Sequence, residues 1–236
     1  MRLETDMVNN SSWKNFIRIS KHYYEMVDFV NKTENICPQK ENVFRFLDSD
    51  LNSIKCVILG MDPYPSTYIK DGKELPVATG RAFEVANIDK FTDKYKQQSL
   101  ANIFKALCFY KFGIEYTMGE LRSEDMLAKI KYIKVKDWFD KMEDSGVLFL
   151  NATLTTVIGK SGAHIDIWTD FMDELIKYIS QNTSCKWLIW GNVALNRVKD
   201  IIDKDDIIYS CHPASRQNNN FVEDCCFKKV DNIIWY

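Results

Sequence analysis

Three polar residues that could do chemistry stand directly after apolar segments of the sequence. They are Asp62 in ILGMDPYP (58–65), Asn151 in LFLNATLTT (148–156) and His212 in CHPASR (211–216). A carboxylate can orient a water or stabilise a cation, a carboxamide can read a donor–acceptor pair, and a neutral imidazole can donate to a developing anion. A plain turn would use Asp-Gly or Asn-Gly, whereas Asp62 stands between a Met and a rigid Pro-Tyr-Pro. This segment therefore suits the floor of a pocket better than a surface bend.

The apolar segments that precede these residues predict buried parallel strands. Each is short, rich in Val, Ile, Leu or aromatic residues, and closed by Gly or a polar residue. The four predicted strands are 54–60, 146–151, 186–191 and 206–211. Apolar residues recur with helical spacing in other stretches, which predicts helices at 13–30, 99–113, 165–180, 193–202 and 220–234.

Alternating strands and helices indicate an α/β protein. We predict a single-domain three-layer αβα fold with a central four-stranded parallel twisted sheet. The domain spans residues 1–236, with a helical N-terminal part at 1–50 and a catalytic core at 54–236. Internal repeats, low-complexity tracts and Gly/Ser linkers are absent from the sequence, which favours one domain.

Asp62, Asn151 and His212 each follow the carboxyl end of a predicted strand. Ligands of open parallel sheets bind outside those ends, so the fold would bring the three residues to one rim. Taken singly, each also has a structural explanation: a turn cap, a strand terminator and a packed histidine. Their joint placement favours a functional site.

Charge and composition restrict the function further. With 31 basic and 33 acidic residues the net charge is −2, which argues against broad electrostatic coating of nucleic acid. The Lys-rich stretch 129–141 could line a local basic groove, but a solvated helix face is the preferred interpretation. Seven Cys without a C-x-x-C pair predict neither a disulfide framework nor a metal site. We find no stretch long enough to span a membrane and no signal peptide at the start, and therefore expect an intracellular protein.

Several motifs in order resemble those of family 1 uracil-DNA glycosylases. GMDPYP resembles that family's GQDPYH, LFLNATLTT its LLLNxxLTV, and CHPASR its HPSPLS. Three further motifs are similar to family sequences: GRAF (80–83), QSLANIFKAL (98–107) and WLIWGNVA (187–194). The resemblance runs from about residue 54 to the C terminus, and in motif detail it is nearest to the poxvirus-type branch.

The resemblance implies an enzyme that hydrolyses the N-glycosidic bond of a flipped-out uracil in DNA and leaves an abasic site for base-excision repair. Asp62 and His212 are the expected catalytic residues. Met61, Tyr64, Phe83 and Asn151 are the expected substrate-binding residues. Asn151 would read the Watson–Crick edge of uracil, Tyr64 would exclude a thymine methyl, Phe83 would stack on the base, and backbone near Met61 would hold O2. No metal or cofactor is expected.

The expected DNA-binding residues are Ser99, His164, Ser215 and Arg216. They depart from the family pattern more than the pocket does. Ala214 replaces a phosphate-binding Ser and Arg216 stands where a Leu usually wedges into the base stack. The segment 66–79 has no family counterpart. The remaining histidine, His22, lies on a predicted helix and is interpreted as structural.

Two alternatives stay open at the level of sequence. One is a glycosylase-like DNA-binding or replication-partner protein with little or no activity. The other is an unrelated nucleotide-binding α/β protein, which predicts a Gly-rich phosphate loop that is not found after the first strand. The expected partners are uracil-containing DNA, single- or double-stranded, and a proteinaceous inhibitor or replication partner. We expect a monomer without membrane attachment, cytoplasmic in a prokaryote or virus-infected cell and nuclear in a eukaryote.

Overall fold

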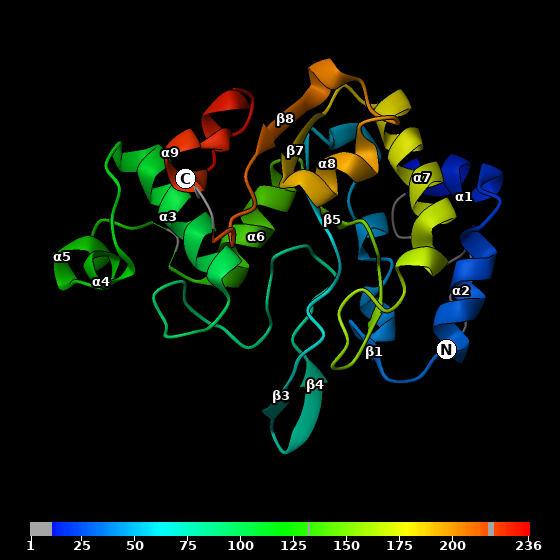
Figure 1. The fold of residues 1–236 in the computed structure, drawn as a ribbon, viewed down its shortest axis with the longest axis horizontal. Coiled ribbons are helices and arrows are strands. Elements are labelled where there is room, and N and C mark those ends of the chain that lie inside the picture. Colours follow the sequence, from blue (N-terminus) through cyan, green and yellow to red (C-terminus); the bar gives the residue numbers. More distant parts are fainter. Residues whose placement is uncertain (1–10, 132, 217–219) are drawn as a thin grey trace.

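A four-stranded parallel sheet forms the centre of the protein in the computed structural model, which describes residues 11–131, 133–216 and 220–236 (Figure 1). The strand order is β5-β2-β7-β8. The strands are β2 (Cys56–Gly60), β5 (Val147–Asn151), β7 (Lys186–Trp190) and β8 (Ile207–Ser210). All neighbouring pairs in this sheet are parallel, so the predicted sheet is confirmed.

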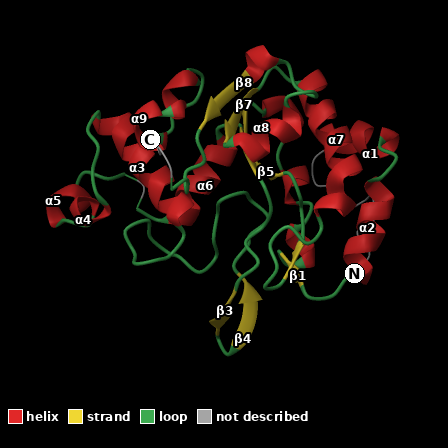
Figure 2. Cartoon of the chain, viewed as in Figure 1, coloured by secondary structure: helices red, strands yellow, loops and turns green. Residues whose placement is uncertain are grey.

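Helices cover both faces of the sheet (Figure 2). Successive side chains of each strand point to opposite faces, so both faces need apolar partners. Val57 and Leu59 of β2 pack in a core with α1 (Lys14–Ile19), α2 (Tyr23–Lys32), α7 (Ile165–Asn182) and α8 (Asn192–Val198). Cys56 and Ile58, which point to the other face, pack with α3 (Gln98–Phe112), α6 (Val135–Asp144) and α9 (Phe221–Asp224). The predicted three-layer architecture is therefore confirmed.

The predicted helix 13–30 is wrong in one respect, because it is broken between α1 and α2 at residues 20–22. Ser20 ends α1 with an extended backbone, and its hydroxyl accepts from the Tyr23 N–H at 3.1 Å. Glu174 of α7 accepts from the Ser20 hydroxyl at 2.6 Å and lies 3.0 Å from His22 Nδ1. These bonds to a neighbouring helix stabilise the break, and they give His22 the structural role that was expected. The first ten residues of the predicted N-terminal part lie outside the described residues.

Two predicted helices near the C terminus are shorter than expected. The prediction 220–234 is wrong beyond α9, because Cys225 adopts a left-handed conformation (φ 40°) that ends the helix. The prediction 193–202 is wrong beyond Val198, where the chain tightens into a turn and the Ile201 N–H bonds to the Val198 carbonyl at 2.9 Å.

The segment 66–79, for which no structure was predicted, contains a β-hairpin. Strands β3 (Thr67–Lys70) and β4 (Lys73–Pro76) pair antiparallel and form a sheet of their own. Asp71 and Gly72 form the turn with positive φ angles of 53° and 74°, as an Asp-Gly hairpin turn requires. In Figure 1 the hairpin projects away from the central sheet.

The remaining elements are short. They are β1 (Ile36–Cys37), which pairs with β6 (Thr156–Val157), the helices α4 (Met118–Leu121) and α5 (Glu124–Leu127), and several 3-10 turns. In the Lys-rich stretch 129–141, helix α6 starts at Val135 and buries Trp138 and Phe139. The lysines of this stretch lie on or beside the solvated face of the helix, in agreement with the interpretation preferred from the sequence. In the described part of the chain, no helix is long and apolar enough to cross a bilayer.

Candidate active site

The three chemistry-bearing residues lie at one edge of the sheet, as the sequence predicted. Asn151 ends β5 and is paired in register with Gly60, the last residue of β2. Asp62 follows Gly60 by two residues, and His212 follows the end of β8 by two residues. Because β2, β5, β7 and β8 are all parallel, their carboxyl ends meet at this edge.

Asp62 is held by the loop that follows β6. Its Oδ2 accepts from the Ser161 hydroxyl and from the Gly162 N–H, each at 2.7 Å. Among the described residues, both of these hydrogen bonds fall on the same carboxylate oxygen, Oδ2. Ser161 and Gly162 were missed at the level of sequence, although small residues between the second strand and the following helix were a usable signal.

The side chains of Asn151 and Phe83 both lie close to the backbone of Gly60. A Cβ atom at Gly60 would lie 2.4 Å from Asn151 Oδ1 and 3.5 Å from the Phe83 ring, so the backbone can pass here only without a side chain. Asn151 is 5% exposed, which restricts its carboxamide to ligands that enter the pocket. Phe83 has a φ of 66°, unusual for a residue with a side chain, and its ring lies 4.9 Å from that of Trp190.

His212 faces the same space from the fourth strand. Its ring centroid lies 6.4 Å from that of Phe83, and its Cβ approaches Gly191 so closely that a Cβ there would lie 2.9 Å away. The Ala214 N–H donates to His212 Nδ1 at 3.1 Å, which places the proton of a neutral ring on Nε2. Burial lowers the pKa of His212 below 6.5, so the imidazole is neutral at pH 7.

Comparisons with known proteins agree with this arrangement. The chain is 32% identical over 222 residues to the uracil-DNA glycosylase of Borrelia turicatae (strain 91E135), covering 89% of this chain and 85% of the relative. The chain belongs to the uracil-DNA glycosylase family. No family model matches the chain.

Solved structures of the uracil-DNA glycosylase family have a similar fold. Mimivirus uracil-DNA glycosylase is 26% identical with a TM-score of 0.63, over 86% of this chain and 68% of that chain. The UNG from Nitratifractor salsuginis is 18% identical with a TM-score of 0.66, over 89% and 86%. Uracil excision from DNA by hydrolysis of the N-glycosyl bond is the activity of this family, so the predicted family, function and enzyme class are confirmed. The nearness to the poxvirus-type branch stays a prediction.

The other two residues expected to bind the base lie on the same loop as Asp62. Tyr64 packs against the core on the α3 side of the sheet, and burial raises its pKa to about 12. Its phenol therefore stays neutral and serves as an apolar wall. The Met61 carbonyl accepts from the Thr153 N–H at 2.9 Å, and its side chain is 38% exposed. Met61 thus faces away from the closed part of the pocket, and of this residue only the backbone fits the expected contact with uracil.

Two residues expected to contact DNA are buried instead. His164 is 6% exposed, packs edge-on against Phe29, and has Nδ1 2.9 Å from the Thr155 hydroxyl. In this conformation the ring packs inside the loop after β6, and the DNA contact expected of His164 stays a prediction. Ser99 at the start of α3 is 8% exposed and offers little surface to a phosphate.

The last two expected DNA contacts remain at the surface. The Ser215 N–H donates to the His212 carbonyl at 2.8 Å, which fixes the turn that follows His212. Arg216 is exposed and lines a polar pocket of about 610 Å³ together with Lys96 and Lys105. Glu115 also lines this pocket and lies 3.9 Å from Lys105, so Lys96 and Arg216 supply the positive charge that remains beside the loop after β8.

A buried ion cluster anchors the segment that carries Phe83. Arg81, which replaces an apolar family residue in GRAF, is 5% exposed. Its guanidinium donates to Glu84 at 3.2 Å, to Asp140 at 2.7 Å and to Glu143. Asp140 and Glu143 belong to α6, so the cluster fastens the segment that carries the strained Phe83 to a core helix.

Proposed function

We propose that this chain excises uracil from DNA with Asp62 and His212 as catalytic residues and with Asn151, Phe83 and Tyr64 as the base pocket. The observation that carries the proposal is the clustering of three side chains: Asn151 and Phe83 lie beside Gly60, and the His212 ring lies 6.4 Å from the Phe83 ring, with Asp62 two residues after Gly60. A uracil in this space meets a carboxamide, an aromatic face and an imidazole at once. Reaching it requires the nucleotide to leave the base stack.

Asn151 supplies base recognition in this proposal. Its carboxamide oxygen accepts from uracil N3–H and its NH₂ donates to O4, whereas cytosine presents the reverse pattern at both positions. Tyr64, a neutral and immobile wall, occupies the space that a thymine C5 methyl would need. Phe83 stacks on the base, and the ring of Trp190 behind it limits its movement.

Asp62 and His212 supply charge stabilisation. As the glycosidic bond breaks, the sugar gains positive charge and the uracil gains negative charge. The Asp62 carboxylate stabilises the sugar cation, and Oδ1 orients the water because Oδ2 is held by Ser161 and Gly162. His212 donates from Nε2 to uracil O2, since the Ala214 N–H occupies Nδ1. The bond between the sugar carbon and uracil N1 breaks, and uracil leaves as the anion that solvent then protonates. The water oxygen bonds to the sugar carbon, and the Asp62 carboxylate accepts the water proton and passes it to solvent.

The DNA strand crosses this edge of the sheet beside Arg216, Ser215 and the pocket with Lys96 and Lys105. We include a protein inhibitor among the partners to test, because a variant of mimivirus UNG, 24% identical to this chain with a TM-score of 0.66 over 90% of this chain and 73% of that chain, is solved in complex with UGI. The alternative of a DNA clamp without activity is disfavoured, since a clamp needs neither the held carboxylate nor the neutral imidazole.

The test is uracil release from single-stranded and duplex oligonucleotides that contain one uracil, with cytosine and thymine in matched controls. The protein is incubated without added metal, and abasic sites are cleaved by alkali. We expect cleavage at the uracil position alone. Absence of alkali-labile sites with a folded protein that binds the DNA would overturn the proposal in favour of the clamp.

A further inference from the structure

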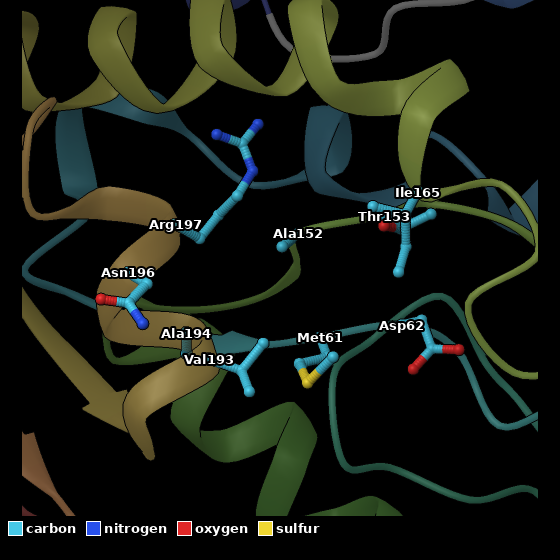
Figure 3. Close-up of a pocket in the computed structure, with 9 residues that line it drawn as sticks. All are labelled: Met61, Asp62, Ala152, Thr153, Ile165, Val193, Ala194, Asn196 and Arg197. Carbon is cyan, nitrogen blue, oxygen red and sulfur yellow. The ribbon is translucent and has the colours of Figure 1, made fainter.

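A groove with an apolar lining runs beside the Asp62 carboxylate (Figure 3). Its volume is about 290 Å³. The nine lining residues are Met61, Asp62, Ala152, Thr153, Ile165, Val193, Ala194, Asn196 and Arg197. They come from the loops after β2 and β5 and from the first turns of α7 and α8. We call this feature the apolar groove.

The walls of the apolar groove are exposed hydrophobic side chains from three separate elements. Met61 is 38% exposed, Ile165 is 43% exposed and Val193 is 60% exposed. Because all three side chains line the same groove, their exposed surface is contiguous rather than scattered. The groove therefore offers a ligand a surface for apolar contact.

The charges in the apolar groove exclude a phosphate as its occupant. Arg197 is the cation among the lining residues, and it is already paired with Asp173 and donates to the Thr169 carbonyl at 2.8 Å. In Figure 3 its side chain extends toward α7, away from Met61 and Asp62. The other charged residue of the lining is Asp62, which repels anions. A neutral, flat and largely apolar ligand fits this lining better.

The position of the apolar groove indicates which neutral, flat ligand would bind there. Met61 and Asp62 line the groove and also belong to the loop that supplies the proposed catalytic carboxylate, so the groove borders the place where the uracil sugar would lie. Any DNA strand that places a uracil sugar against Asp62 brings the adjoining nucleotide to the groove. The volume lies just below the roughly 300–1,000 Å³ of small-molecule sites, which suits one ring system rather than several nucleotides.

We propose that the apolar groove receives the nucleobase adjacent to the uracil in the same strand. The contact with Met61, Ile165 and Val193 is to the face and edge of the base, so it tolerates any of the bases. This inference rests on the proposed function, since it assigns a second subsite to the same DNA strand. With this second subsite, excision depends on the base next to the uracil as well as on the phosphates of the DNA strand.

The test compares short single-stranded oligonucleotides with one central uracil. In one substrate both neighbours carry bases, and in two others the base immediately 5′ or 3′ is replaced by a tetrahydrofuran abasic analogue. For the wild-type protein we expect kcat/KM to fall about fivefold or more on one of the two sides, mainly through KM, as removal of a contacted base would produce. The sensitive side identifies the strand direction across the groove.

Variants then locate the effect. Ile165→Ala combined with Val193→Ala should lower kcat/KM about fivefold on the fully based substrate and leave it unchanged on the substrate that lacks the sensitive base. Ile167→Ala is the matched control, because Ile167 lies on the same helix and is 41% exposed but does not line the groove. It should behave like the wild-type protein on all substrates.

The outcomes separate the two proposals. Uracil release that is equally efficient with and without the neighbouring bases overturns the groove assignment and leaves the proposed function standing. Equal losses in the double variant on based and abasic-neighbour substrates also overturn the assignment, as does loss of discrimination in the Ile167→Ala control. No uracil release from any substrate by the wild-type protein overturns both proposals. The substrate comparison uses the wild-type protein alone, so it decides the matter even if the double variant fails to fold.

Discussion

The base pocket and the DNA-facing surface of this protein are built in different ways. In the pocket, Asp62 and His212 each have an atom fixed by groups of the protein, and Asn151 is confined against Gly60. On the DNA-facing surface, Arg216 projects into solvent, while the expected contact His164 is buried. The proposed catalytic groups are thus positioned before DNA binds, whereas we expect the proposed DNA contacts to find their partners on binding.

The largest expected effect is at the fixed carboxylate. Asp62→Asn should retain the fold and DNA binding and lower the excision rate by about 10²–10⁴, because the amide can neither stabilise the sugar cation nor accept a proton from water. Single-turnover kinetics with saturating protein measure this rate. The control is Asp166→Asn, an exposed carboxylate of α7. A rate for Asp62→Asn within a factor of two of wild type would mean that the pocket does not work through a preset carboxylate.

The second prediction concerns the stability that the Arg81 ion cluster gives to the segment carrying Phe83. Arg81→Leu leaves Glu84 buried without its cation, so we expect about 3 kcal/mol lower free energy of unfolding, at the low end of broken buried pairs because Asp140 and Glu143 are partly exposed. Urea unfolding measures the loss. Arg197→Leu is the matched control, and its half-exposed pair with Asp173 should cost about 1 kcal/mol or less. Equal losses in the two variants would show that the Arg81 cluster is no more than a surface network.

The third prediction concerns base recognition by Asn151, whose loss should lower kcat/KM. Asn151→Ala leaves two uracil groups unpaired, each at a cost of roughly 1–3 kcal/mol, so kcat/KM should fall by about 10²-fold or more. The matched control is Asn52→Ala, an exposed Asn in the turn before β2, which should keep kcat/KM on uracil within a factor of two. Unchanged excision in Asn151→Ala would show that another group reads the base.

The protonation state of His212 gives a smaller test. Because burial lowers its pKa, the ring binds a proton only below pH 6.5, and its charge change lies on the acid side of that value. NMR titration of the labelled imidazole carbons should report a neutral ring with the proton on Nε2 at pH 7 and a midpoint below 6.5. A midpoint at or above 6.5 would contradict the idea that the pocket fixes a neutral donor.

The smallest expected effect is on the DNA-facing surface. Arg216→Ala should weaken duplex binding and reduce the slope of log affinity against log salt by up to about one unit, as loss of one phosphate contact requires. Excision from single strands, where little base stack must be opened, should suffer less than excision from duplex. Lys204→Ala at the opposite end of β8 is the control and should leave the slope unchanged. A slope unaffected by Arg216→Ala would show that this side chain stays in solvent.

The sheet and the pocket could be predicted from the sequence because their signals are local and contiguous. Each buried strand is a short apolar run, and each catalytic residue follows one within two positions. Parallel topology then places Asp62, Asn151 and His212 together without any knowledge of side-chain contacts. The confirmed fold rests on this combination of apolar runs and chain order.

Two features escaped prediction because a long-range contact decides them, whereas the helices 193–202 and 220–234 end early through the local backbone after Val198 and at Cys225. The break between α1 and α2 depends on Glu174, more than 150 residues away, and the burial of His164 depends on Phe29. Residues at those distances leave no trace in a local pattern. The hairpin at 67–76 is a different case, because its Asp-Gly turn was a readable signal.

The hairpin also has a practical meaning. Its base is clamped, since the Val77 N–H bonds to the Ser66 carbonyl at 2.9 Å and the Gly159 N–H bonds to the Pro65 carbonyl at 2.8 Å. Changes at its tip are therefore mechanically isolated from the loop that carries Asp62, although the two are joined by a few residues. A fluorophore or an affinity tag inserted at the Asp71-Gly72 turn would sit on an arm that starts at the catalytic loop, and it would report on approaching DNA without disturbing the chemistry.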